Sequence, residues 1–383
     1  MRIAIFTDSF WPQINGVTTS ILNMVRVLSR QGHSFLIYAP KPAGEVKTFP
    51  SIKHVEVVWL PARPLPTYPD YLIAYSFSHE AEKKFKDFNP EIVHIHTPFF
   101  VADQGIKLAQ RNKIPVIGTF HTLVSEFLEY VPLPLLKDNP IMKQLTWTYT
   151  QRFYGRCDLI STPTQVLADE LIFHGFSKVR VLSNGIDYHL FASTKATPPK
   201  KTKNLVYFGR ISFEKRIDVA IEVLKLLREK DPAFILNLIG AGPAETSLKR
   251  KAFDLGLGKH VHFIGPKSGK ALATAVKRNH VLLAPSPMET QGLYILEAMA
   301  AGLPIVGCAM RAIPVALGKN ERGLLFANGD ARDAAEKVVK IMEHPPLRKK
   351  LVTNAKKWVK RYSQEAIARE WLRMYQEMVS QQP

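Results

Sequence analysis

The sequence lacks most features of a disulfide-rich or membrane-spanning protein. Only two of its 383 residues are cysteines, Cys157 and Cys308, and both stand in apolar surroundings, so we expect buried free thiols, consistent with a reducing compartment. No apolar run reaches about 18 residues, so no membrane-spanning helix is expected. Residues 1–13 indicate a strand with Asp8 inside it rather than a signal peptide. Peripheral contact with a membrane surface stays open.

Acidic residues are scarce relative to basic ones. The chain carries 52 Lys and Arg against 33 Asp and Glu, a net charge of +19. Most of this excess lies in the second half, because residues 1–190 hold 19 basic and 16 acidic side chains whereas residues 191–383 hold 33 and 17. A basic surface of this size favours anionic partners, namely nucleic acid, acidic lipid or phosphorylated ligands.

Alternating strands and helices fill both halves of a chain that is too long for one ordinary domain. The chain opens with a strand at residues 2–6, a helix at 17–30 and a strand at 34–38; Gly16 marks the loop-to-helix junction without forming G-x-G-x-x-G, which weakens an NAD-binding interpretation. Residues 192–203 contain two prolines and four lysines and indicate a linker. The predicted organisation is therefore α/β, with domains at 1–191 and 204–360 and a final helix within 361–383 that packs back on the first domain.

The segment from Pro285 to Val306 organises the second half. A buried strand precedes it, and Gly292 marks the start of a mostly apolar helix at residues 293–301. Such a strand–loop–helix unit is where a doubly wound sheet places its ligand, and the helix N-terminus suits a phosphate. Glu289 in the loop and Glu297 in the helix are either site carboxylates or ordinary charges; a buried charge at Glu297 needs a partner.

Other candidate site residues follow predicted strands. His121 lies just beyond a strand at residues 115–117, as a site residue or as a solvated loop histidine. Arg210 and Lys215 bracket the next strand–helix loop, and two cations there suit a pyrophosphate clamp better than plain surface charge. Residues 123–156 form an apolar and aromatic excursion, which serves either packing or an acceptor groove or membrane-facing patch.

Together these segments resemble the retaining family 4 glycosyltransferases of two-Rossmann (GT-B) architecture. The finer motifs look most like bacterial enzymes that glycosylate diacylglycerol, and phosphatidylinositol mannosyltransferases share much of the pattern. The resemblance covers essentially the whole chain and is carried by PQINGV at 12–17, HIHTPF at 94–99, GTFHT at 118–122, NGID at 184–187, GRISFEK at 209–215 and ETQGLYILEAMAAGLP at 289–304.

The resemblance implies a cleft between the two domains and a nucleotide-sugar donor, UDP-glucose by analogy, held by the second domain. Arg210 and Lys215 would hold and stabilise the departing diphosphate, Glu297 the ribose, and Glu289 the donor sugar. His121 would contact the sugar and the developing oxocarbenium charge, and Gly16 would let the loop approach the donor. Retention would proceed by same-face attack, in which the leaving phosphate takes the acceptor proton. Further donor-binding positions implied by the resemblance are Gly209, Gly292, Leu293 and Tyr294.

The sequence departs from many relatives in two places. Asn15 stands where a second glycine is common, which predicts a stiffer loop. Asp-x-Asp is absent, so no metal and no cofactor are expected, and the cations and a helix N-terminus would hold the diphosphate.

The expected acceptor is a lipid such as diacylglycerol, met at the inner face of the cell membrane by a cytoplasmic, peripherally bound enzyme. Contacts with an anionic membrane surface are expected at Lys83, Lys84 and Lys86 and in the excursion at Phe127 and Tyr130. The alternatives are hexosyl transfer to phosphatidylinositol or to a soluble sugar, and a non-catalytic basic binding protein. No nucleic-acid-binding motif accompanies the basic charge.

Overall fold

The computed structural model describes residues 1–381 apart from 14, 43–48, 66–67 and 122–138, and the chain forms two compact units. The first unit is Met1–Gly185 with Gln364–Pro383, and the second is Ile186–Ser363. The division therefore falls earlier than the predicted boundary at residue 191, because helix α7 (Tyr188–Ser193) packs against helices of the second unit. Ser363 also stays with the second unit through a bridge to Ile186.

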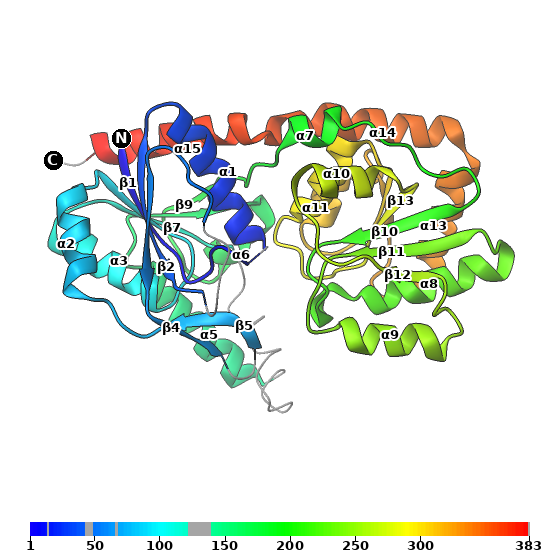
Figure 1. Ribbon diagram of the computed structural model, residues 1–383, viewed down its shortest axis with the longest axis horizontal. Helices are drawn as coiled ribbons and strands as arrows, with labels where there is room; N and C mark the ends of the chain where they lie inside the picture. The colour runs from blue at the N-terminus through cyan, green and yellow to red at the C-terminus, as the bar shows by residue number, and fades with distance from the viewer. Residues whose placement is uncertain (14, 43–48, 66–67, 122–138, 382–383) are drawn as a thin grey trace. The chain divides into compact units, whose positions relative to one another are not determined.

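The first unit is built on a seven-stranded parallel sheet with strand order β3-β2-β1-β6-β7-β8-β9 (Figure 1). The order reverses between β1 and β6. The strands are β1 (Arg2–Phe6), β2 (Ser34–Pro40), β3 (Val55–Leu60), β6 (Ile92–Ile95), β7 (Val116–Thr119), β8 (Leu159–Thr162) and β9 (Val179–Val181). The helices are α1 (Gly16–Arg30), α2 (His79–Phe88), α3 (Phe100–Arg111), α5 (Pro140–Tyr154), α6 (Gln165–Phe173) and α15 (Gln364–Ser380).

The second unit repeats this plan with six parallel strands in the order β12-β11-β10-β13-β14-β15. Its order reverses between β10 and β13. The strands are β10 (Lys203–Phe208), β11 (Phe234–Ile239), β12 (Val261–Phe263), β13 (Val281–Ala284), β14 (Ile305–Cys308) and β15 (Leu324–Phe326). The other elements are η2 (Phe213–Lys215), α8 (Ile217–Lys230), α9 (Glu245–Asp254), α10 (Gly269–Lys277), α11 (Leu293–Ala301), α12 (Ile313–Leu317), α13 (Ala331–Glu343), α14 (Pro345–Val359) and η3 (Lys360–Tyr362).

The central strands form because their sequences are continuous apolar runs that can be covered on both faces. In β1, four of five residues are buried, and in β13 all four are. This pattern is typical of parallel sheets whose two faces both carry helices. The predicted α/β class with two doubly wound sheets is therefore confirmed.

The last helix, α15, belongs to the first unit, as the sequence predicts. It packs against α1 and buries Trp371 and Tyr375. The figure follows it in red along α1, which is drawn in blue (Figure 1). The chain thus enters the second unit after Gly185 and returns at Gln364.

An antiparallel hairpin of β4 (Ala62–Leu65) and β5 (Tyr68–Ala74) has no counterpart in the sequence prediction. Prolines in this segment hide the strand pattern, and the hairpin tolerates Pro64 because two-stranded pairs have open edges. Among the described residues, no helix is both long and apolar enough to cross a membrane. Cys157 and Cys308 are buried and free, as expected.

Candidate functional site

The predicted donor residues of the second unit gather at its topological switch point. Arg210 and Lys215 follow β10, whereas Glu289 follows β13, and these two strands are neighbours at the place where the strand order reverses. Ligands of open parallel sheets bind at this edge. The fold therefore brings together side chains separated by more than seventy positions in the sequence.

An ion pair joins the two sides of the switch point. Lys215 Nζ lies 2.9 Å from Glu289 Oε1, and the Glu289 side chain is only 7% exposed. The backbone carbonyl of Glu289 also accepts from Ala312 N at 3.3 Å, which anchors the loop to the start of α12. The carboxylate thus holds the ammonium group in one position at the mouth of the loop.

The second cation, Arg210, is held in the same way. Its Nη2 donates to Glu214 Oε1 at 2.9 Å, and Ser212 Oγ donates to the same oxygen at 2.5 Å. Burial raises the pKa of Glu214, but the charge of Arg210 and the bond from Ser212 outweigh it and leave the pKa below its ordinary value. Glu214 therefore stays ionised and fixes the guanidinium group.

Backbone contacts between neighbouring loops support the Arg210 loop. A Cβ on Gly240 would lie 1.9 Å from the carbonyl oxygen of Gly209, and a Cβ on Gly242 would lie 2.3 Å from that of Ile211. Ile211 N also donates to Ala241 O at 2.9 Å. The Gly-Ala-Gly sequence after β11 is therefore required for close packing under the cation loop. This role of the two glycines was not predicted, although a glycine pair after a strand was its signal in the sequence.

The helix that follows Glu289, α11, runs from Leu293 to Ala301 between Gly292 and Gly302, with the bounds that the sequence predicts. Gly292 has φ of 75°, a left-handed conformation, and as a glycine it offers no side chain to cap the N-terminus of α11. Leu293 is half-buried, and Tyr294 is buried with its ring 5.6 Å from that of Tyr207. An uncapped helix N-terminus beside Lys215 and Glu289 suits an anionic group.

Glu297 lies half-buried on α11, one turn beyond the helix start. Burial and, secondarily, the charge of Asp187 raise its pKa to about 8. Asp187 itself caps α7 by accepting from Leu190 N at 3.0 Å. The sequence predicted that Glu297 needs a partner; among the described residues none donates a hydrogen bond to it, and the neighbour is a second carboxylate rather than a cation.

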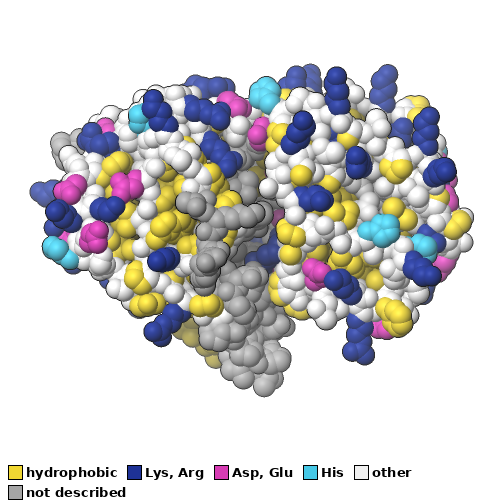
Figure 2. Space-filling view, viewed as in Figure 1, with side chains coloured by type: hydrophobic (Ala, Val, Ile, Leu, Met, Phe, Trp, Pro, Cys, Tyr) yellow, Lys and Arg dark blue, Asp and Glu magenta, His cyan; other side chains and the backbone are white. Residues whose placement is uncertain are grey.

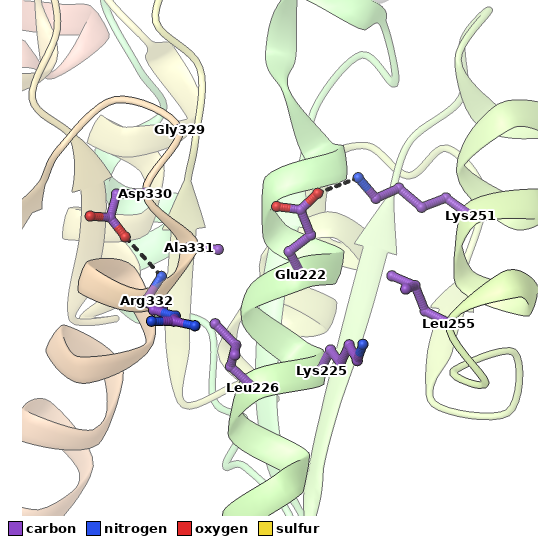
Figure 3. Close-up of a pocket in the computed structure, with 9 residues that line it drawn as sticks. All are labelled: Glu222, Lys225, Leu226, Lys251, Leu255, Gly329, Asp330, Ala331 and Arg332. Carbon is purple, nitrogen blue, oxygen red and sulfur yellow. Dashed lines mark hydrogen bonds and ion pairs between the residues drawn. The ribbon is translucent and has the colours of Figure 1, made fainter.

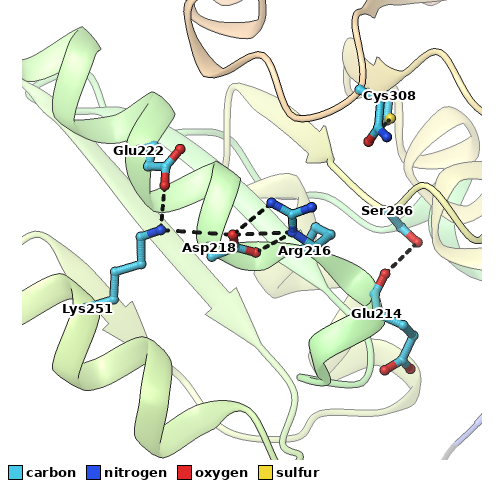
Figure 4. A network of polar contacts seen from close by, with 8 residues as sticks. Glu214, Arg216, Asp218, Glu222, Lys251, Ser286 and Cys308 are labelled. Carbon is cyan, nitrogen blue, oxygen red and sulfur yellow. Dashed lines mark hydrogen bonds and ion pairs between the residues drawn. The ribbon is translucent and has the colours of Figure 1, made fainter. Parts of the chain in front are cut away.

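The network in Figure 4 anchors η2 and the start of α8. Arg216 Nε donates to Asp218 Oδ1 at 3.1 Å, and Lys251 Nζ lies 2.5 Å from Glu222 Oε1. Ser286 Oγ donates to Glu214 O at 3.4 Å, which ties η2 to the loop after β13. These contacts hold the segment that carries Lys215 without involving Lys215 itself.

Two cavities lie beside this network. One, of about 200 Å³, is lined by η2, the start of α8 and α9, and includes Ser212. The other, of about 510 Å³, lies between α8, α9 and the start of α13, where Lys225, Lys251 and Arg332 alternate with Glu222 and Asp330 (Figure 3). Neither is lined by Arg210, Lys215 or Glu289, so the predicted donor residues lie outside both.

In the first unit, His121 follows β7 and is buried together with two histidines of the neighbouring β6 segment. His121 Nε2 lies 2.9 Å from His96 Nδ1, and the rings of His94 and His96 are 3.9 Å apart. Burial lowers the pKa of His121 to about 3 and holds the pKa of the other two well below their ordinary value. All three imidazoles are therefore neutral. Of the three histidines, only His121 was predicted as a site residue; the His-Ile-His spacing at the end of β6 was the available signal for the other two.

Gly16 is the first residue of α1, and no described atom lies within 4 Å of the position of a Cβ there. The role of Gly16 in donor approach stays a prediction. Asn15 caps the helix by accepting from Thr18 N at 3.0 Å, and its Nδ2 donates to Ser9 Oγ at 2.7 Å. These two bonds fix the Asn15 side chain, and the stiffer loop stays a prediction.

The predicted membrane-contact residues divide into two groups. On α2, Lys84 pairs with Glu56 and Lys86 pairs with Glu82 at 2.9 Å, whereas Lys83 is exposed. Phe127 and Tyr130 lie outside the described residues. The described part of the aromatic excursion is α5, which buries Phe153 and Tyr154 but exposes Ile141 (69%), Leu145 (55%) and Tyr149 (43%). These three residues are spaced four apart and form one apolar stripe.

The basic excess is spread rather than focused on the face shown in Figure 2. Lys and Arg side chains are scattered over the second unit there, interrupted by apolar patches. Among the described residues, no group of three or more His, Cys, Asp or Glu side chains has the arrangement of a metal site.

Comparison with known proteins agrees with this geometry. The family model described as Glycosyl transferases group 1 matches residues 191–358, and the model described as Glycosyltransferase Family 4 matches residues 14–190. An alpha-monoglucosyldiacylglycerol synthase from Streptococcus pneumoniae is 28% identical over 320 residues, which cover 80% of this chain and 70% of that protein. A GDP-mannose-dependent alpha-mannosyltransferase from Corynebacterium glutamicum is 25% identical over 392 residues, covering 99% and 90%. The solved structure of Anabaena HepE in complex with UDP-glucose has a TM-score of 0.75 at 16% identity, covering 98% of this chain and 100% of that one.

Two doubly wound parallel sheets give the chain the GT-B fold of this solved structure. The glycosyl transferase group 1 model at residues 191–358 and the Glycosyltransferase Family 4 model at residues 14–190 together cover most of the chain and identify it as a glycosyltransferase. The resemblance predicted from the sequence motifs is thereby confirmed.

Proposed function

We propose that this glycosyltransferase moves a hexose, glucose in the first instance, from a nucleoside diphosphate sugar to diacylglycerol, with retention and without a metal ion. The observation that carries the proposal is the pair of carboxylate-fixed cations at the switch point. Arg210 and Lys215 are both anchored, and the uncapped N-terminus of α11 follows Glu289. Positive groups fixed in this way stabilise a diphosphate that gains charge as it leaves.

Each donor residue receives a role that fits its environment. We assign the diphosphate to Arg210 and Lys215, with the loop backbone from Gly209 and the helix start at Gly292, Leu293 and Tyr294 around it. Glu289 accepts hydrogen bonds from sugar hydroxyls through the oxygen that Lys215 leaves available. Glu297, whose raised pKa keeps it largely protonated at neutral pH, can both donate to and accept from ribose hydroxyls.

The first unit supplies the remaining contacts of the proposal. His121 bonds an oxygen of bound substrate, and Gly16 leaves room for it beside the stiff Asn15 turn. The acceptor proton passes to the departing phosphate during same-face attack, so none of the three neutral histidines is needed as a base.

A lipid acceptor is favoured by two observations. The relative from Streptococcus pneumoniae is named for making a glucosyldiacylglycerol, and α5 exposes an apolar stripe of Ile141, Leu145 and Tyr149. We propose that this stripe and the basic surface of the chain, including Lys83, bring the protein to the inner, anionic face of the cell membrane as a peripheral enzyme. Such binding weakens as salt increases.

The test is a transfer assay with purified full-length protein, with and without EDTA. UDP-glucose, UDP-galactose and GDP-mannose are each offered with diacylglycerol, phosphatidylinositol or a soluble sugar. The expected result is transfer of glucose from UDP-glucose to diacylglycerol, unchanged by EDTA, with an α-linked product. Absence of transfer for every pair would contradict the proposal, and loss with EDTA would contradict metal independence.

A second candidate is mannosyl transfer from GDP-mannose to phosphatidylinositol or a soluble acceptor. The similarity to a GDP-mannose-dependent mannosyltransferase over 99% of this chain favours it. The same assay distinguishes the two candidate functions, because each predicts product with a different donor and a different acceptor.

A further inference from the structure

The first unit contains a line of aromatic and imidazole rings that the proposed reaction does not use. It begins at Trp371 of α15, whose ring is 4.6 Å from that of His94. His94 packs 3.9 Å from His96, and His96 Nδ1 lies 2.9 Å from His121 Nε2. Because β6 and β7 are paired in parallel, the residues that follow them meet at the same edge. The C-terminal helix thus reaches His121 through two buried histidines.

His94 has both nitrogens occupied. Nδ1 lies 2.7 Å from Tyr375 Oη, and Nε2 lies 2.6 Å from Thr119 Oγ1. Tyr375 Oη also lies 3.1 Å from Met24 Sδ, and Thr119 Oγ1 also pairs with Ser161 Oγ at 2.6 Å, so both partners of His94 are held in place. Because both of its nitrogens are hydrogen-bonded to these groups, His94 has none left to bond His96. His94 therefore acts as a fixed plate against which the His96 ring packs.

His96 differs because only one of its nitrogens has a partner. Its Nδ1 faces His121, whereas its Nε2 is buried without a hydrogen-bond partner in the part of the chain that the structure describes. Two neutral imidazoles leave two arrangements for the proton between them. If His121 donates, His96 must carry its proton on Nε2, where it is a buried N–H with no acceptor. If His96 donates, Nε2 is a bare nitrogen, and buried donors without partners are rarer than under-used acceptors.

We propose that His96 donates its Nδ1–H to His121 Nε2 and so holds His121 as the tautomer that carries its proton on Nδ1. His121 then presents an N–H donor, rather than a bare nitrogen, to an oxygen of the bound substrate. His96 is a positioning residue in this scheme, since it acts through His121. The inference deepens the proposed function and rests on it for the identity of the substrate oxygen.

The same arrangement defines what His121 does not do. With Nε2 accepting from His96 and Nδ1 protonated, neither nitrogen of His121 can take a proton from the acceptor hydroxyl. Burial also lowers its pKa to about 3, so the ring does not become an imidazolium at neutral pH. His121 is thus a neutral donor, which suits a reaction in which the leaving phosphate receives the proton.

The tautomer is measured directly by two-bond proton–nitrogen NMR spectra of the full chain labelled with ¹⁵N-histidine. The chain has 12 histidines, and the His121 signal is assigned by its absence from the spectrum of His121→Asn. The expected spectrum shows a protonated Nδ1 and a bare Nε2 on His121. A protonated Nε2 on His121 in the wild-type protein overturns the proposal, whether or not the protein transfers sugar.

Two variants of nearly equal shape test whether the tautomer of His121 affects the rate of sugar transfer. His96→Asn keeps an N–H donor near the place of Nδ1, whereas His96→Asp offers only acceptor oxygens there. We expect His96→Asn to transfer sugar within about threefold of wild type and His96→Asp to lose roughly 10- to 100-fold in kcat, the size of one unsatisfied buried group. In His96→Asp we expect the ring proton of His121 to move from Nδ1 to Nε2, which the same NMR spectrum detects.

Equal losses in both variants would show that His96 serves packing alone and would overturn the proposal. If His96→Asp does not fold, the wild-type spectrum and His96→Asn still decide it. If the wild-type protein transfers no sugar from any donor, the proposed function fails, while the spectrum still settles the tautomer.

Discussion

The two units carry different kinds of side chains at the corresponding edge of their parallel sheets, where the strand order reverses. In the second unit the switch point carries ionised groups, with Lys215 paired to Glu289 and Arg210 to Glu214. In the first unit the corresponding edge is buried and its histidines are neutral, because burial holds His121 uncharged. Burial also raises the pKa of Asp8, which accepts from Val101 N and Thr97, to about 6, so this carboxylate stays mostly ionised at pH 7. The topology thus fixes where side chains meet, and local burial decides whether they are charged.

This difference suits the proposed transfer from a nucleoside diphosphate sugar to an uncharged hydroxyl acceptor. A diphosphate needs fixed cations, and these are useful only when anchored by carboxylates that keep them in place. A hydroxyl acceptor and a sugar need directional hydrogen bonds from neutral groups. The following predictions test whether the charged edge and the neutral edge have these separate roles.

The largest effect is expected at the charged edge. Lys215→Ala and Glu289→Ala should each lower kcat for sugar transfer by at least about 100-fold, because each removes one fixed group at the diphosphate or sugar. Purified variants are assayed with the donor that the wild type uses, and folding is checked by thermal unfolding. Lys249→Ala, which removes a surface ion pair with Glu245 in the same unit, is the matched control and should stay near wild type. Near-normal turnover in Lys215→Ala would end the assignment of a charged donor edge.

The second-largest effect is expected where the backbone at Gly240 packs against the loop that carries Arg210. In Gly240→Ala the new Cβ would lie 1.9 Å from the Gly209 carbonyl oxygen, so the loop must move. We expect the second unit to lose about 2–3 kcal/mol of stability, seen as a lower unfolding temperature together with weaker donor binding. Gly258→Ala, where nothing lies within 4 Å of the Cβ, is the control and should change little. Donor binding that is unaffected in Gly240→Ala would separate this packing from the site.

The sequence predicted the charged edge better than the neutral one. Helix 293–301 was correct because Gly292 and Gly302 mark both ends with left-handed conformations, and Arg210 and Lys215 stood out as cations in a strand–helix loop. His96 was missed because a buried histidine inside an apolar run looks like core, and its meaning depends on a neighbour 25 positions away. Contacts between β6 and β7 cannot be inferred without the strand order.

Other differences have equally local causes. The hairpin at 62–74 was missed because prolines mask its strand pattern. The structure divides the chain after Gly185, whereas the sequence predicted a linker at residues 192–203, because α7 packs against helices of the second unit. The ion pairs of Arg210 and Lys215 with Glu214 and Glu289 depend on side-chain placement across a folded edge. The interdomain cleft stays a prediction of the resemblance.

Glu297 is an exception to the contrast between the units. It lies in the second unit, at the charged edge, but its raised pKa keeps its carboxyl group largely protonated at neutral pH. Its pKa is raised from 4.5 in the unfolded chain to about 8 in the fold, so the folded state binds the extra proton between these values. Stability therefore falls as pH rises through this window, and we expect a loss of about 2 kcal/mol between pH 6 and pH 8 from this group. Glu297→Gln, which is neutral at every pH, should lose less over the same interval in urea unfolding measured at both values. If the two proteins respond alike to pH, Glu297 is ionised in the fold, and its proposed double role as donor and acceptor toward ribose does not hold.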